Sequence, residues 1–232
     1  MGFIINPYLV QPSIPAIITT NLVMNLDAGN PLSYSGTGTT WTDLTGNGNN
    51  GNLLNGVSYS SANQGSLVFD GTDDNVRVNS TTITNRDNNL TVEFWYKGYY
   101  PLGGPTVAQL WYTRYPSGGF NLNNFDSYWK STKFLVADNI MGTVPQNDNW
   151  HQVVLTYSSN SSSGVRFYVD GALNAFNTNT QNVSIPSGGY LTIGLAESMH
   201  RGNISICRFY NSVLSASDIL QNFNAVKGRY GL

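Results

Sequence analysis

Short runs of alternating apolar and polar residues, separated by turn-forming clusters, recur from about residue 21 to the end of the chain. Residues 90–98 (LTVEFWYKG), 150–159 (WHQVVLTYSS) and 202–211 (GNISICRFYN) are three of them. A period of two places successive side chains on opposite faces of a strand. Regular spacing of such runs is typical of an antiparallel sandwich, and it predicts about ten to fourteen strands. We therefore expect an all-β antiparallel sandwich.

Two segments carry hairpin signals. Residues 65–78 (GSLVFDGTDDNVRV) and 164–176 (GVRFYVDGALNAF) each contain an Asp–Gly pair between apolar runs. Asp–Gly favours the tight turns of β-hairpins, so each segment predicts two paired strands.

One short helix is expected at the C-terminus. Ser215 is placed as an N-cap with Asp218 in the first turn, and Leu214 and Ile219 are spaced as a hydrophobic staple. Four residues predict the apolar face of this helix: Ile219, Leu220, Phe223 and Val226.

Composition excludes several classes of protein. Only 10% of residues are charged and the net charge is −2, so no basic surface is available to bind nucleic acid. No stretch approaches the roughly 18–20 apolar residues of a membrane span. The single cysteine, Cys207, cannot form a disulfide within the chain and is expected to be buried.

Residues 1–20 predict an extended N-terminal arm, followed by one domain over residues 21–232. Three prolines interrupt the arm, and no basic region precedes its apolar residues, which disfavours a signal peptide. Exposed apolar side chains are a liability in a free tail, so the arm is expected to pack on its own domain or on a neighbour. The assembly residues would be Phe3, Ile4, Ile5, Tyr8 and Leu9.

Residues 41–60 (WTDLTGNGNNGNLLNGVSYS) fit a calcium loop, a phosphate loop or a plain turn. Counted from Asp43, the twelfth position of an EF-hand loop is Leu54, where a glutamate is required. No Gly–Lys–Ser/Thr follows to bind phosphate. The glycines permit positive φ, which favours a tight ordered loop.

Asp70, Asp73 and Asp74 lie within five residues of one another. Three carboxylates this close repel unless a cation or backbone N–H groups compensate them. Two interpretations stay open, a calcium site and a plain acidic turn, and calcium is the candidate cofactor.

Catalysis finds little support in the sequence. A glycosidase needs two carboxylates across one bond, yet the only glutamates are Glu93 and Glu197. Glu93 could face a groove, but no second carboxylate lies two or four residues away on its strand. Neither His151 nor His200 has a nucleophile elbow nearby. We expect no enzyme activity.

Residues 98–120 are the richest in aromatic side chains, and Trp129 follows soon after. Flat rings pack on the apolar faces of sugars, and the same residue types dominate protein interfaces, while core packing is the third interpretation. The candidate ligand-binding residues, for glycan or protein, are Tyr99, Tyr100, Trp111, Tyr112, Tyr115, Asp126 and Trp129.

The succession LDAGN, FDGTDDNVRV, DNWHQVVLTY, VRFYVDGAL and GNISICRFYNSVLSASDILQNFNA resembles the concanavalin A-like, laminin-G-type lectin/glucanase superfamily over about residues 22–232. The resemblance implies a jelly roll of two antiparallel sheets that binds glycans or proteins, in some members with calcium. Some members hydrolyse glucans through a Glu–x–Asp–x–x–Glu or Glu–x–Asp–x–Glu strand, which this chain lacks. It also implies fold roles for Trp150, His151, Tyr157, Tyr168, Asp170 and Gly171.

The ending NFNAVKGRYGL and the Asn- and Ser-rich style resemble copies of this domain in virion proteins of tailed bacteriophages and other large DNA viruses. This implies a non-catalytic structural or attachment protein of a virion, such as a head decoration, tail or fibre component. Its partners would be other virion proteins, further copies of itself and surface glycans. A free-standing lectin is the alternative, and a glucanase is a distant third.

Overall fold

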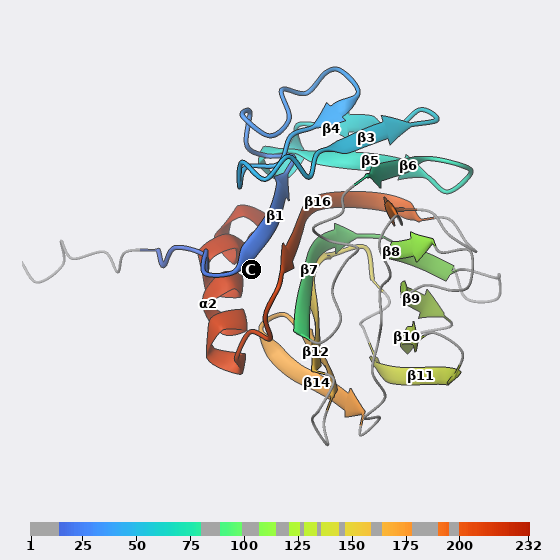
Figure 1. Cartoon of the computed structure of the whole chain (residues 1–232). Helices are drawn as coiled ribbons and strands as arrows, with labels where there is room; N and C mark the ends of the chain where they lie inside the picture. Colours follow the sequence, from blue (N-terminus) through green and yellow to red (C-terminus); the bar gives the residue numbers. More distant parts are fainter. Residues whose placement is uncertain are drawn as a thin grey trace, which may run out of the picture.

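The chain folds into two stacked antiparallel sheets with one helix against the outside of the first (Figure 1). The structure is a computed structural model that describes residues 14–79, 89–98, 107–114, 121–125, 128–133, 136–143, 147–158, 164–177, 190–194 and 200–232. Between residues 107 and 143 it describes backbone pairing only. The all-β sandwich and the short C-terminal helix are confirmed. The described residues contain sixteen strands, more than expected, because strands as short as β2 and β4 carry too few residues to show a period.

The first sheet, sheet A, has eight strands, and β1 and β5 lie end to end along one side of β16. Its order is β14 (Ala172–Asn177), β13 (Val165–Val169), β12 (Trp150–Ser158), β7 (Asn89–Lys97), β16 (Arg201–Tyr210), β5 (Ser66–Asp70) and β4 (Ser58–Ser60), with β1 (Leu22–Asp27) also on β16.

The second sheet, sheet B, also has eight strands. Its order is β11 (Val136–Thr143), β10 (Tyr128–Lys133), β9 (Asn121–Phe125), β8 (Val107–Arg114), β15 (Tyr190–Ile193), β6 (Asn75–Val78), β3 (Gly51–Leu54) and β2 (Thr40–Trp41).

The main core fills the space between the two sheets. Alternate residues of both sheets are buried there, as period-two patterning requires. The largest include Trp41, Phe69, Phe94, Tyr157, Phe167 and Phe209. Cys207 is fully buried among them, as expected.

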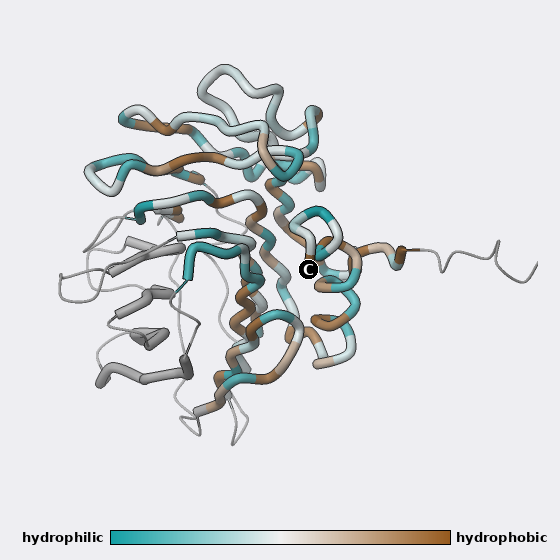
Figure 2. The backbone as a smooth tube through the Cα atoms, turned by 180° about the vertical axis from the view of Figure 1, so that it is seen from behind, coloured by the Kyte–Doolittle hydropathy of each residue, from teal (hydrophilic) through white to brown (hydrophobic). Residues whose placement is uncertain are grey.

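The outer face of sheet A is covered as well. Helix α2 (Ala216–Val226) and the 3₁₀ turn η2 (Lys227–Tyr230) lie against it (Figure 1). Beneath them are two smaller apolar clusters, one around Tyr210 and Ile219 and one around Trp95 and Tyr230. Strands β7 and β12 are therefore buried on both faces, and Figure 2 shows apolar segments recurring along the strands beside the helix.

The N-terminal segment from residue 14 to 20 also lies on the helix side of the molecule (Figure 1). The backbone N–H of Ile18 donates to Asn222 Oδ1 at 2.8 Å, and the Gln221 amide donates to the Ala16 carbonyl at 2.8 Å. The arm residues Phe3, Ile4, Ile5, Tyr8 and Leu9 lie outside the described residues.

The helix begins as predicted. The Ser215 side chain accepts from the Asp218 N–H while the Asp218 carboxylate accepts from the Ser215 N–H, which forms a capping box. The prediction for Leu220 is wrong, since its side chain is 47% exposed. The buried position is taken by Asn222, whose amide is needed for hydrogen bonds to sheet A.

The predicted hairpin at Asp170–Gly171 is confirmed, because β13 and β14 pair directly. The one at residues 65–78 is wrong. Strand β5 belongs to sheet A and β6 to sheet B, so the turn between them is a corner that joins the sheets. Its apolar residues, Phe69 before the turn and Val76 after it, reach the same core from opposite sides.

The glycine-rich loop after β2 is tight and ordered, as predicted. The Asp43 carboxylate accepts four hydrogen bonds: from the N–H groups of Asn25, Thr45 and Asn49, and from the Thr45 hydroxyl. Gly46 and Gly48 have φ of +81° and +76°. No helix in the described ranges is long and apolar enough to cross a membrane.

Candidate functional site

One row of polar residues crosses the outer face of sheet B. Each member is the direct cross-strand partner of the next, over seven neighbouring strands. We call this set the polar row: Thr40, Asn52, Arg77, Thr192, Tyr112, Asn121 and Thr132. Every member carries a hydroxyl, an amide or a guanidinium.

Alternation along the strands places this row on the side away from the core. In β6, Val76 and Val78 are buried in the core, so Arg77 between them faces outward. In β15, Leu191 and Ile193 flank Thr192 in the same way. Strands spaced about 4.8 Å apart make a seven-strand row roughly 29 Å long, which is long enough for an extended ligand.

The middle of the row is prearranged by a cation–π contact. The Arg77 guanidinium carbon lies 3.6 Å from the centre of the Tyr190 ring, and Arg77 Nε donates to Asn79 Oδ1 at 3.1 Å. A cation–π contact holds the arginine through the face of its guanidinium, so the N–H groups at the edge can still donate hydrogen bonds. The free N–H groups of this guanidinium can bind hydroxyl oxygens, while the neighbouring Asn52 is exposed and can both donate and accept.

Three of the aromatic candidates fall in described strands. Tyr112 is paired with Thr192, which puts its backbone position on the line of the polar row. Trp111 is paired with Leu122 in β9, and Trp129 with Asn124, two residues along the same strand. The register therefore puts both tryptophan positions on lines that alternate with the polar row. The other candidates, Tyr99, Tyr100, Tyr115 and Asp126, lie outside the described residues.

The three aspartates of the β5–β6 corner are brought together. One carboxylate oxygen from each of Asp70, Asp73 and Asp74 lies within 4.8 Å of the others. Asp70 accepts from the Thr72 N–H at 2.7 Å, and Asp74 Oδ2 accepts from the Asp70 N–H at 2.9 Å. Part of the repulsion is thus offset by backbone donors.

Asp74 is the member of this corner with an unusual environment. It is only 4% exposed, and its Oδ1 has no hydrogen-bond partner among the described residues. Burial raises the pKa of Asp74 above its usual value, and the charges of Asp70 and Asp73 raise it further. Carboxylate oxygens are ligands that suit a hard cation such as Ca²⁺, so the donor set fits one.

Glu93 does not face a groove. It lies on the outer face of β7 beneath α2 and is 1% exposed. Its Oε1 accepts from Arg208 at 2.9 Å, from the Gln152 amide at 3.0 Å and from the Trp95 ring at 3.2 Å, and its Oε2 accepts from Asn222 at 2.8 Å. The expectation of a groove failed because the C-terminal helix covers this face. A carboxylate so enclosed binds the helix to the sheet.

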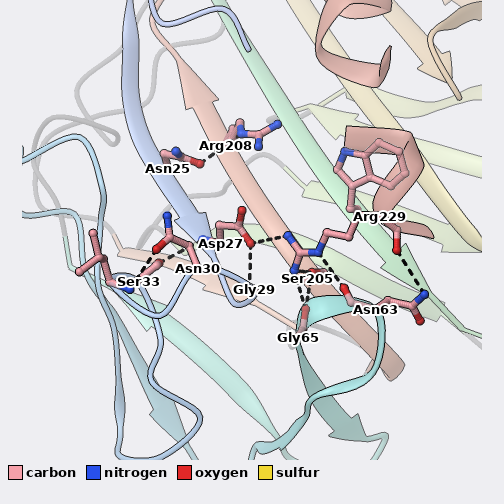
Figure 3. Close-up of polar contacts among 12 residues, drawn as sticks. Asn25, Asp27, Gly29, Asn30, Ser33, Asn63, Gly65, Ser205, Arg208 and Arg229 are labelled. Carbon is pink, nitrogen blue, oxygen red and sulfur yellow. Dashed lines mark hydrogen bonds and ion pairs between the residues drawn. The ribbon is translucent and has the colours of Figure 1, made fainter. Parts of the chain in front are cut away.

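Arg229 forms the most connected cluster near the C-terminus (Figure 3). Its guanidinium donates to Asp27, to the Gly65 carbonyl and to the Ser205 hydroxyl, at 2.6–2.7 Å. A side chain at Gly29 would collide with this guanidinium, so glycine is required there. The cluster ties the C-terminal turn to β1 and β16, and it leaves Arg229 little capacity for a ligand.

The residues at the start of β12, which include His151, also have structural partners. His151 Nδ1 lies 2.8 Å from the Asp170 carboxylate, whose other oxygen accepts from the Gln152 N–H. The Trp150 ring donates to Asn63 at 3.1 Å. These contacts connect β12 to the β13–β14 turn and to the loop before β5, which agrees with fold roles for these residues.

This fold and the polar outer face of one sheet define a lectin-type jelly roll. The family model described as "Concanavalin A-like lectin/glucanases superfamily" matches residues 70–220, about two thirds of the chain. The chain belongs to this family. No curated protein sequence matches it.

Solved structures share the fold at low sequence identity. Domain 4 of AbnA, an extracellular arabinanase from Geobacillus stearothermophilus in complex with arabinotriose, aligns with a TM-score of 0.68 and 16% identity, over 87% of this chain and 98% of that domain. Trypanosoma rangeli sialidase in complex with sialic acid aligns with a TM-score of 0.67 and 19% identity, over 92% of this chain and 34% of the sialidase. The binding domain of botulinum neurotoxin serotype G aligns with a TM-score of 0.68 and 12% identity, over 88% of this chain and 50% of that one.

Sequence reasoning missed most of the polar row. Alternation within GNLL, NVRV and YLTI marks Asn52, Arg77 and Thr192 as outward residues. That they form one row depends on the registers of six strand pairs, three of which join strands that are not consecutive in the sequence. Only Tyr112 was selected, on its aromatic character.

Proposed function

We propose that this chain is a non-catalytic attachment component of a virus particle, which binds surface glycans through the outer face of sheet B. The polar row is the observation that carries the proposal. A line of hydroxyl, amide and guanidinium groups, in which Asn52 is exposed and Thr192 is only 5% exposed, matches the alternating hydroxyls of a saccharide chain. Tyr190, which lies against Arg77, supplies a ring of the kind that packs on sugar faces.

The similar structures are consistent with glycan binding. The AbnA domain is in complex with arabinotriose, and its whole length corresponds to this chain. A botulinum neurotoxin binding domain is described in complex with SialylT, and the chain spans about half of that protein. The ligands belong to those proteins, and at these identities they support a glycan only as a class.

The absence of catalysis is part of the proposal. Glu93 is enclosed by four donors, and none of its hydrogen-bond partners carries a second carboxylate. General acid–base hydrolysis needs two carboxylates that both reach the bond.

Calcium at the β5–β6 corner also belongs to the proposal. The supports are the three clustered carboxylates and the buried, unpartnered Oδ1 of Asp74. Asp74 lies three residues before Arg77, roughly 10 Å along the strand, so an ion would lie beside one end of the outer face.

The virion context rests on the apolar N-terminal arm, which would dock on another virion protein or on a further copy. The alternative, a free-standing lectin, uses the same row but needs no docked arm. Particle proteomics and labelling with an antibody against this chain separate the two: presence on purified particles supports attachment, and absence supports the lectin.

The glycan site is tested by array binding of the full chain beside Arg77→Gln and Asn52→Ala. Both variants are expected to lose binding by about tenfold, since each removes hydrogen bonds to the ligand. Lys97→Gln, on sheet A, is the matched control and should bind normally. Undiminished binding by Arg77→Gln and Asn52→Ala would place the site elsewhere.

A further inference from the structure

A cavity lies on the outer face of sheet A, on the side of the molecule opposite the polar row. Its volume is about 370 Å³, within the range of small-ligand sites. Strands β7, β12 and β13 form its floor, and the loop between β16 and α2 forms one wall. The lining includes Asn89, Thr156, Ser158, Arg166, Ser212 and Val213.

The wall is fixed in position by a buried threonine. The Thr91 hydroxyl donates to the Ser212 carbonyl at 2.8 Å and accepts from the Leu214 N–H at 2.9 Å. Thr91 is fully buried in β7, so the loop is fastened to the strand that forms the floor. A cavity with a fastened wall is preformed, which lowers the entropic cost of binding.

The floor combines one cation with hydroxyl groups, and an exposed ring lies on the neighbouring edge strand, outside the lining. Thr156 is paired with Arg166, and Arg166 with Phe176 on the edge strand β14. Phe176 is 58% exposed, and Val213 on the wall is 39% exposed. Among the described residues no carboxylate lines the cavity, and the Arg166 side chain has no ion pair or hydrogen bond there.

We propose that this cavity binds a carboxylate-bearing sugar, separately from the polar row. The Arg166 guanidinium matches a carboxylate bidentately. The hydroxyl and amide groups of Thr156, Ser158 and Asn89 suit sugar hydroxyls, and Val213 offers apolar surface to the sugar ring. A single cation balances one negative charge, which suits a carboxylate better than a doubly charged phosphate.

The test is calorimetric titration of the full chain with D-glucuronate, with D-glucose as the uncharged counterpart and inorganic phosphate as the anion probe. Glucuronate is expected to bind more tightly than either. Arg166→Gln should weaken glucuronate binding by about tenfold or more, the expected loss for one charge-assisted pair. Lys97→Gln, which lies outside both the cavity and the polar row, should leave it unchanged.

Val213→Glu provides a second variant on the loop. Its carboxylate would lie in the cavity, compete for Arg166 and abolish glucuronate binding. Equal binding of glucose and glucuronate, tighter binding of phosphate, or normal glucuronate binding by both variants would overturn the proposal. Loss of binding in Arg77→Gln but not in Arg166→Gln would also overturn it, and would assign the acidic sugar to the polar row.

Discussion

At the residue scale, the largest expected effect on stability belongs to the buried pair of Glu93 and Arg208. Their charged atoms lie 2.9 Å apart with side-chain exposures of 1% and 3%. Glu93→Gln leaves the Arg208 charge buried without compensation, so we expect the free energy of unfolding to fall by about 3–5 kcal/mol. Chemical denaturation measures this change.

The control for Glu93→Gln is an exposed ion pair that also involves β7. Lys97 and Asp148 lie 3.7 Å apart with side-chain exposures of 34% and 65%. Asp148→Asn should change the free energy of unfolding by less than about 1 kcal/mol. Equal effects of the two substitutions would contradict a buried, structural role for Glu93.

Asp74 should make stability depend on pH. Because its folded-state pKa is raised above 3.8, the folded protein holds this proton more tightly than the unfolded chain. The resulting stabilisation is fully present below pH 3.8, the pKa of the carboxyl in the unfolded chain, and it is lost as the pH rises through the raised pKa of the folded state. Asp74→Asn removes this loss, so urea midpoints from about pH 3.5 to pH 7 should increasingly favour the variant.

Calcium has a distinct signature at the same corner. If the three carboxylates hold an ion, calcium should raise the melting temperature of the unmodified chain, since a ligand of the native state stabilises it. Asp74→Asn should show little of this rise. A melting temperature of the unmodified chain that is the same in calcium and in chelator would exclude the ion.

At the scale of single elements, α2 depends on its capping box. Ser215→Ala removes the side-chain acceptor for the Asp218 N–H, at 3.2 Å, and should cost about 1 kcal/mol. Ser61, which precedes the 3₁₀ turn η1 (Ala62–Gln64), forms no side-chain cap, so Ser61→Ala is a matched control with no expected change. Thermal unfolding of the two variants compares them directly, and equal melting temperatures would count against the cap.

Elements differ in how well the sequence predicts them. The N-cap of α2 was predictable because its signals lie within four residues of one another. The β5–β6 corner was not, because Asp–Gly specifies a turn without specifying whether the flanking strands pair. The exposure of Leu220 was likewise hidden, since it depends on a hydrogen bond between Asn222 and Glu93, residues 129 positions apart.

In the candidate site, too, some features follow from neighbouring residues and others only from the arrangement of distant strands. That Arg77 faces outward follows from its apolar neighbours in β6. Its place in a row with Thr40 and Tyr112 follows from strand order, which no local pattern contains. Which residues of a strand face the core can therefore be predicted residue by residue, while a surface assembled from seven strands requires the fold.

At the scale of the whole molecule, the arm can be tested separately from the domain. A chain that starts at Ile14 keeps the bonds of Ala16 and Ile18 to α2, whereas one that starts at Thr20 loses them. We expect the full chain to be oligomeric by light scattering and both truncated chains to be folded monomers, with the shorter one melting at a lower temperature. Monomers throughout would exclude self-assembly through the arm.

The described N-terminal segment and the C-terminal turn both lie on the helix side of the molecule, and the polar row lies on the far side of sheet B (Figure 1). Copies fastened by their arms to a common scaffold would all present the row in one direction. Each contact with a glycan could then be weak, because the second and later contacts of such an array form at a high effective concentration. Avidity, rather than the affinity of one site, would decide whether the particle stays bound.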